Sequence, residues 1–220
     1  MTFWVTASSL ATAFGTLVLA LATFASVRSA NRSARSADRA ARVAERSLMA
    51  GLQPLLVNSR LADADQKITF AEGVWHAVPG GRGMVVVRDD VVFMAVSLRN
   101  VGNGLAVLHG WHVQAERLFT RDHPSIDEFT AQQRDIYIAP GDIGFWQGAL
   151  RDPQAAVFDP VVAAARAGDS LTLHVLYGDW EGGQRVITQF YLRPAKENWI
   201  ASAVRHFNVD RSDPWLDRGE

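Results

Sequence analysis

Apolar and polar positions divide the chain into two parts that meet near residue 50. Residues 2–27 contain no Asp, Glu, Lys, Arg or His, and their centre, residues 17–21, is strongly apolar. About 20 apolar residues are enough to cross the hydrocarbon core of a bilayer as a helix. Trp4 lies near one end of this run, where an amphipathic ring suits the headgroup region. We therefore expect a transmembrane helix over residues 1–27.

A cleaved signal peptide is the main alternative for this segment. Residues 20–22, Ala-Leu-Ala, resemble a cleavage site. A signal peptide opens with a basic region, however, and residues 1–27 contain no basic side chain. The arginines that follow favour the cytoplasmic side of a membrane. We therefore expect an uncleaved single-pass anchor in the cell membrane, with the N-terminus outside and the C-terminal domain in the cytoplasm.

Residues 28–50 predict a continuation of the same helix as a basic juxtamembrane stalk. Arginines recur in steps of four and three, which places them in one stripe at about 100° per residue. The stripe consists of Arg28, Arg32, Arg35, Arg39, Arg42 and Arg46. Asp38 and Glu45 reduce the net charge of residues 28–46 to +4 (six arginines less two acids). Gly51 predicts the end of the helix.

Two interpretations of the arginine stripe stay open. It is either a solvated face that fixes membrane topology, or a surface that binds anionic lipid headgroups at about 1 kcal/mol per residue. On a straight helix only the first arginines lie within a Debye length of the membrane. We therefore predict membrane-surface contacts for Arg28, Arg32 and Arg35. No aromatic residues interleave the arginines, so we expect no nucleic-acid binding.

Small residues on one face of the first half predict helix self-association. Ala11 and Gly15 are four positions apart, and Ala22 falls near the same face. Such a small-xxx-small pair lets two helices approach closely, which would give a homo-oligomer. The alternative is that Ala and Gly are simply frequent in membrane helices.

Beyond residue 50 the pattern changes to short runs with period-two alternation, which is typical of half-buried strands. The expected strands span residues 55–57, 67–70, 84–87, 91–98, 105–115, 143–150, 171–177, 185–193 and 199–209. Two short helices are expected over residues 125–133 and 161–167. The fold class is therefore mainly β, with an antiparallel β-sandwich over residues 51–210 and a polar tail over residues 211–220.

Composition excludes several kinds of site. The chain has no cysteine, which excludes disulfides, thiolate metal sites and cysteine nucleophiles and is consistent with a reducing compartment. Its net charge is −1, so removing the +4 stalk leaves −5 on residues 47–220. A mildly acidic domain does not attract nucleic acid.

Three short sequence segments resemble segments of a known fold. Residues 96–104 (VSLRNVGNG), residues 138–142 (IAPGD) and residues 173–179 (LHVLYGD) resemble immunoglobulin-like sandwiches, in which a strand ends in Asn-x-Gly and a later one is entered through Pro-Gly-Asp/Glu. The layout of the chain also resembles uncharacterised actinobacterial-type single-pass membrane proteins with a charged stalk and a β domain. The resemblance implies this fold and anchor, and no activity.

No stretch predicts a metal, cofactor or catalytic site. His109 and His112 are three apart on a strand and are expected on opposite faces, with His109 in the core. Residues 178–183 combine two carboxylates with Trp180, but their glycines are typical of a β-turn, and we interpret them as one. Residues 100–104 are interpreted as a turn, because Gly and Asn tolerate positive φ. They lack the strand–helix context and the lysine of a phosphate loop.

The sequence thus predicts a non-enzymatic interaction or scaffolding module that presents a β-sandwich at the inner face of a bacterial membrane to an unknown protein partner. Two alternatives remain. One is a membrane-bound enzyme whose site is assembled from scattered residues such as Asp179, Glu181 and His174. The other is an oligomeric membrane-perturbing effector, which the small-residue face of the first helix would support.

Overall fold

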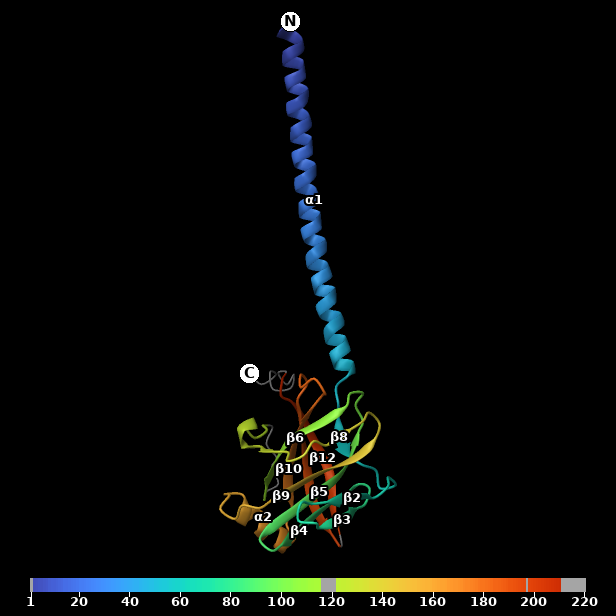
Figure 1. Cartoon of the computed structure of the whole chain (residues 1–220), viewed down its shortest axis with the longest axis vertical. Helices are drawn as coiled ribbons and strands as arrows, with labels where there is room; N and C mark the ends of the chain where they lie inside the picture. Colours follow the sequence, from blue (N-terminus) through green and yellow to red (C-terminus); the bar gives the residue numbers. More distant parts are fainter. Residues whose placement is uncertain (1, 116–121, 197, 211–220) are drawn as a thin grey trace. The chain divides into compact units, whose positions relative to one another are not determined.

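The computed structural model describes residues 2–115, 122–196 and 198–210, with the side chains of residues 2–13 left out. The chain divides into two units, Met1–Ala50 and Gly51–Glu220. The first is a single long helix and the second is a compact, β-rich domain (Figure 1). Each is described by itself.

Helix α1 (Thr2–Gly51) runs without interruption through both predicted halves and ends at the predicted glycine. Its sequence is rich in Ala, Leu and Arg, which are good helix formers, and contains no proline. All side chains from residue 14 to residue 48 are exposed. Among the side chains that are described, no helical stretch is long and apolar enough to cross a membrane. Residues 2–13 of the predicted transmembrane span lie outside that description.

Twelve strands occur in the described part of the second unit, and every pairing is antiparallel. They are β1 (Leu56–Asn58), β2 (Gln66–Thr69), β3 (Trp75–Val78), β4 (Arg82–Arg88), β5 (Val91–Asn100), β6 (Ala106–Gln114), β7 (Thr130–Ala131), β8 (Tyr137–Ile138), β9 (Ile143–Leu150), β10 (Leu171–Gly178), β11 (Val186–Ala195) and β12 (Asn198–Asn208). β2 and β3 form a separate hairpin. The other ten form one sheet in the order β1-β5-β4-β12-β11-β10-β6-β7, with β8 beside β6 and β9 beside β5. The prediction of a mainly β domain is confirmed.

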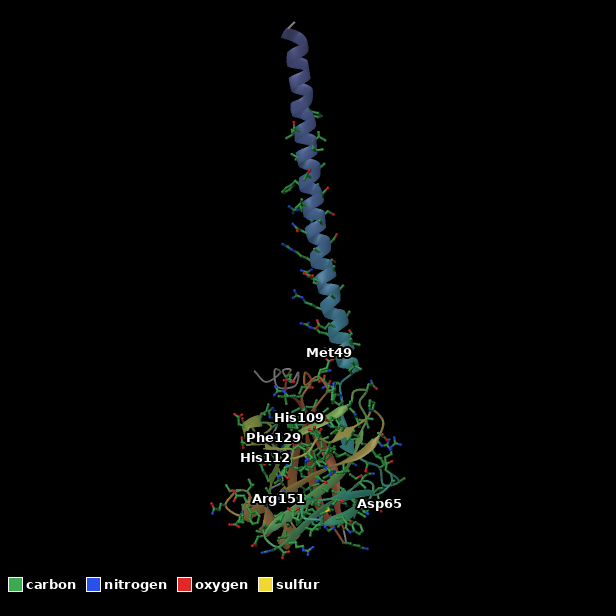
Figure 2. The ribbon with its side chains drawn as sticks, viewed as in Figure 1. Met49, Asp65, His109, His112, Phe129 and Arg151 are labelled. Atoms are coloured by element: carbon green, nitrogen blue, oxygen red, sulfur yellow. The ribbon has the colours of Figure 1, made fainter. Side chains whose placement is uncertain are left out.

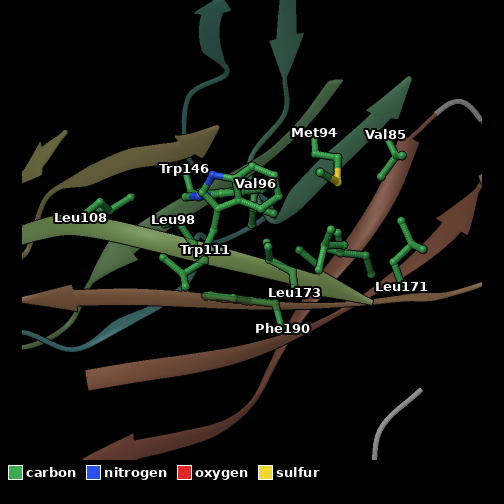
Figure 3. Close-up of a cluster of buried hydrophobic side chains, with 14 of the residues drawn as sticks. Val85, Met94, Val96, Leu98, Leu108, Trp111, Trp146, Leu171, Leu173 and Phe190 are labelled. Carbon is green, nitrogen blue, oxygen red and sulfur yellow. The ribbon is translucent and has the colours of Figure 1, made fainter. Parts of the chain in front are cut away.

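The ten-stranded sheet folds over on itself around one core. β12 pairs with β11 along its length but with β4 at only two positions, Trp199 and Ile200. Beyond this joint, β4, β5 and β9 face β6, β10 and β11, and both sides contribute side chains such as Met94 and Phe190 to the same cluster (Figure 3). The sequence predicted a sandwich, whereas the structure has one hydrogen-bonded path of strands, because the 11-residue β12 belongs to both layers.

The β2–β3 hairpin covers the outer face of β4, β5 and β9. Ile68 and Phe70 pack there against Phe93 of β5, and the rings of Phe70 and Phe93 meet edge to face at 4.9 Å. β5 is therefore buried on both faces, with Met94 in the main core and Phe93 under the hairpin. The prediction of a half-buried β5 was wrong, because the face opposite Met94 is also apolar (Val91, Phe93 and Ala95), and the hairpin packs on it.

A β-bulge in β6 changes which residues face the core. The register with β10 shifts between Leu176 and Tyr177 and leaves His109 without a partner. Leu108 before the bulge and Trp111 after it both reach the core, while His109 stays half-buried outside it. The expectation of His109 in the core was wrong, because strict alternation ends at a bulge.

The two predicted short helices have different outcomes. Helix α2 (Phe158–Ala167) is present and ends at Gly168, whose φ of 75° is the left-handed conformation that glycine adopts without strain. The helix expected over residues 125–133 is only a single 3₁₀ turn, η1 (Ile126–Glu128), followed by β7. β7 pairs with β6, so the edge of the sheet competes successfully for residues that would otherwise continue the helix.

Candidate functional site

β9 is an end strand whose second edge pairs with no other strand of the described chain. It pairs with β5 over its whole length and with nothing else in the described chain. In an antiparallel strand, alternate residues direct their backbone groups to opposite sides. Asp142 O accepts from Asn100 N on the β5 side (3.0 Å), and Gln147 O accepts from the Gln132 side chain on the other side (3.0 Å). The backbone groups of Phe145, Gln147 and Ala149 therefore point away from β5.

A pocket of about 360 Å³ lies along this free edge. Residues 147–149 of β9 form one side, and Phe70 after β2 forms another. Trp111 of β6 and the segment 130–134 around β7 close it. The pocket therefore occupies the seam where the two ends of the folded sheet approach each other.

Two amide oxygens in the pocket wall are buried without a partner. Gln132 is held by its backbone, whose N–H donates to His109 O at 2.8 Å, and by its side-chain Nε2 on Gln147 O. The Oε1 atoms of Gln132 and Gln147 have no hydrogen-bond partner among the described residues. A buried acceptor without a donor costs about 1–3 kcal/mol, so both oxygens favour a bound group that donates hydrogen bonds.

The charged residues of the pocket wall are two arginines. Arg134 is exposed and lies over the Phe145 ring, with its guanidinium carbon 5.6 Å from the ring centroid. Arg151 (Figure 2) is held by Glu72 at 2.6 Å and by Gln133 at 3.2 Å. The hydrogen bond from Arg151 lowers the pKa of the Glu72 carboxyl, so this pair stays ionised at neutral pH. No carboxylate lines the pocket within the described chain, which favours a ligand with negative charge.

Trp111 and Gly148 line the pocket, and Trp146 packs against the Trp111 ring beneath it. Trp111 and Trp146 meet edge to face at 5.6 Å, on the core side of β9 (Figure 3). A Cβ atom at Gly148 would lie 2.6 Å from the Trp146 ring and 2.9 Å from the Trp111 ring. Glycine at this position therefore lets the two rings close the core directly beneath the pocket.

The residues predicted for membrane contact and self-association all lie on α1. Arg28, Arg32 and Arg35 are exposed there. Gly15 and Ala22 are exposed as well, and a Cβ at Gly15 would meet no atom within 4 Å. The side chain of the third predicted contact, Ala11, lies outside the described part of the helix.

The residues considered for a scattered catalytic site are not brought together. The Asp179 carboxylate accepts from Gly183 N at 2.9 Å and from the Gln184 amide at 3.3 Å, which confirms the predicted turn. Glu181 is exposed. His174 is buried on β10, and the charged groups that act on it are other histidines. Within the described ranges, no three His, Asp or Glu side chains are placed to hold a metal ion.

His174 belongs to a cluster of rings on the outer face of β6 and β10. Its ring centroid lies 6.0 Å from that of His112, which in turn lies 5.9 Å from Phe129 beyond η1 (Figure 2). Glu128 reaches to 3.9 Å from His112. Both ring nitrogens of His174 are buried without a partner in the described structure.

The seam pocket was not predicted from the sequence. Its wall combines segments from four distant parts of the chain, so no local sequence motif predicts the pocket. One signal was present: the segment of β9, Ile143–Leu150, contains neither a charged residue nor a proline. End strands usually carry such residues to prevent further pairing.

Comparisons with known proteins add little. No family model matches the chain, and no curated protein matches it. One similar solved structure is a crystal structure of a protein from Archaeoglobus fulgidus, 12% identical, which covers 58% of this chain and 94% of that chain with a TM-score of 0.25. A TM-score this low carries no argument about fold or function.

Proposed function

We propose that the chain is a single-pass membrane protein that holds a β-rich interaction module at the inner face of a bacterial membrane. The observation that carries this proposal is the composition of α1. One uninterrupted helix joins a run without charged residues, 2–27, to a stripe of arginines that begins at Arg28. This order, an apolar segment followed at once by basic residues, is that of a membrane anchor with a cytoplasmic flank.

The continuous helix also limits which arginines meet the membrane surface. Because an α-helix rises about 1.5 Å per residue, Arg35 stands about 10 Å beyond Arg28, and Arg46 about 27 Å beyond it. The Debye length at physiological salt is about 8 Å. The proposal therefore assigns the main headgroup contacts to Arg28 and Arg32, which lie within that length, a weaker contact to Arg35 at its limit, and a solvated role to the later arginines.

The interaction role rests on the second unit. Its seam pocket has orphaned hydrogen-bond acceptors, an aromatic floor and cationic residues, which are features of a binding site. The resemblance to single-pass proteins with a charged stalk and a β domain is consistent with the same layout. The partner in this proposal is a protein.

A charge placed within the apolar run is expected to weaken anchoring. Leu19→Arg puts a guanidinium near the centre of the proposed span, where insertion is strongly disfavoured. In cells that express the full chain, we expect this variant to lower the fraction that stays with membranes at pH 11 at least twofold. Ala44→Arg adds the same charge to the stalk and is expected to leave that fraction unchanged. Equal retention of both variants would contradict the anchor.

Self-association through the helix gives a separate prediction. Gly15→Leu adds a bulky side chain to the small-residue face, so crosslinking of the membrane-extracted chain should lose its dimer band. The matched variant Ala20→Leu lies on a different face of the helix and should keep it. A chain that is monomeric before any substitution would contradict the role of Ala11, Gly15 and Ala22.

A further inference from the structure

The free edge of β9 is a row of open backbone hydrogen-bonding groups. Phe145, Gln147 and Ala149 direct both their N–H and C=O groups into the seam, and only Gln147 O has a partner among the described residues. These groups repeat at about 6.8 Å along the strand, the spacing of another extended chain. A small molecule can satisfy one such group, whereas an added strand satisfies the whole row.

The side chain of Gln132 already occupies one position of that row. Its Nε2 donates to Gln147 O at 3.0 Å, as the backbone N–H of a neighbouring strand would. Its Oε1 is buried with no donor in the described structure. An incoming strand can supply that missing donor, or displace the amide and take over its bond to Gln147.

Nothing in the sequence of β9 blocks such pairing. Exposed sheet edges usually carry charged residues or proline, and Ile143–Leu150 has neither. Residues 147–149 of the strand line the pocket of about 360 Å³. An unprotected edge beside a formed pocket indicates a binding surface.

The positive charge of the pocket wall favours extended segments that carry an acidic side chain. Arg134 and Arg151 are its charged residues, and Arg151 is already paired with Glu72. Arg134 has no ion pair with a described residue and stands over Phe145, at one end of the open row. A carboxylate on the incoming strand would complete this arrangement.

We propose that the free edge of β9 binds an extended peptide segment of a partner protein, which adds to the sheet as a strand and places an acidic side chain beside Arg134. This inference rests on the proposed interaction function and names its class of partner. A second copy of the chain fits less well. In a pair of β9 strands the incoming strand would carry no acidic side chain to place beside Arg134, because Ile143–Leu150 contains neither Asp nor Glu.

The test uses the purified full chain and a phage-displayed library of random octapeptides. Wild type is the bait, and Ala149→Pro is the counter-selection. Proline at 149 removes an N–H that points into the seam and leaves the bonds to β5 intact. We expect enriched peptides that contain Asp or Glu between strand-forming residues. Synthetic versions should bind at least tenfold more weakly to Ala149→Pro.

Two matched comparisons sharpen the result. Arg134→Gln should weaken the binding of acidic peptides at least threefold. Arg88→Gln removes the same charge at the β4–β5 turn and should not weaken this binding. Peptides N-methylated at alternate residues test the strand mode without changing the protein. One set of alternate positions should abolish binding and the other should leave it within twofold. Bound peptide should also slow amide exchange at Gln147 and Ala149.

Several outcomes overturn the proposal. They are the absence of enrichment on wild type over Ala149→Pro, equal effects of both N-methylated sets, and an Ala149→Pro variant that changes only self-association, which would assign the edge to a second copy. Membrane anchoring is measured separately, as the fraction of the chain that stays with membranes at pH 11. A chain that binds peptide but does not stay with membranes contradicts the membrane anchor alone. A chain that stays with membranes but binds no peptide contradicts the proposed role of the β9 edge alone.

Discussion

Replacing Asn100 by alanine is expected to lower the free energy of unfolding by about 4 kcal/mol. The side chain is fully buried and holds four backbone groups at the end of β5. Its Oδ1 accepts from Leu55 N at 3.2 Å and Gly102 N at 3.0 Å. Its Nδ2 donates to Gly104 O at 2.7 Å and Ile138 O at 3.0 Å. Alanine removes all four of these hydrogen bonds.

The matched control lies in the same turn. Asn103 is exposed, so Asn103→Ala is expected to change stability by less than about 0.5 kcal/mol. Asn100→Asp should be at least as harmful as alanine, because a carboxylate would face two carbonyl oxygens that now accept hydrogen bonds. Urea unfolding followed by tryptophan fluorescence measures all three. A loss below about 1 kcal/mol for Asn100→Ala would contradict this role.

The second large effect is a loss of stability in acid that depends on His174. Burial lowers the pKa of its imidazole from 6.5 to about 4, and the neighbouring His112 and His123 add to the shift. Between these two values the unfolded chain takes up a proton that the folded chain does not. Stability is therefore intact above about pH 6.5 and falls as the pH drops toward 4, by about 3 kcal/mol for this group.

His174→Leu is expected to remove the contribution of His174 to the loss of folding stability in acid. The groups that face His174 are His112 on β6, His123 before η1 and, through His112, Glu128. Burial also lowers the pKa of His112, so a smaller slope should remain in the variant. The measurement is the urea midpoint of both proteins between pH 7 and pH 4. The same slope in both would contradict the assignment to His174.

Sequence patterns predicted most of the elements because their signals are local. β9 was expected over residues 143–150 and is found there, following the Pro140-Gly141 turn. Asp89 and Asp90 lie between the strands expected over residues 84–87 and 91–98, and have the positive φ values of 47° and 60° that such a tight connection needs. α2 ends at Ala167, as expected for the helix over residues 161–167, and Gly168 follows it.

Features that depend on pairing between distant strands were not predictable in this way. Alternation assigns a face to Phe93 but cannot show that a hairpin covers it. It also cannot show that β9 has only one neighbour, because that follows from where β6, β7 and β8 end. The seam pocket and the free edge are consequences of strand order, which hydrophobic periodicity does not contain.

The central claim, a single-pass anchor with a cytoplasmic β domain, is tested most directly by sided labelling. The chain has no cysteine, so Asn103→Cys introduces a single exposed thiol in the β domain. In intact bacterial cells that express the full chain, we expect a membrane-impermeant maleimide to leave this thiol unlabelled. Permeabilisation should then allow full labelling, with the protein still in the pH 11-resistant membrane fraction. Labelling in intact cells, or recovery of the protein in the pH 11 supernatant, would contradict the account.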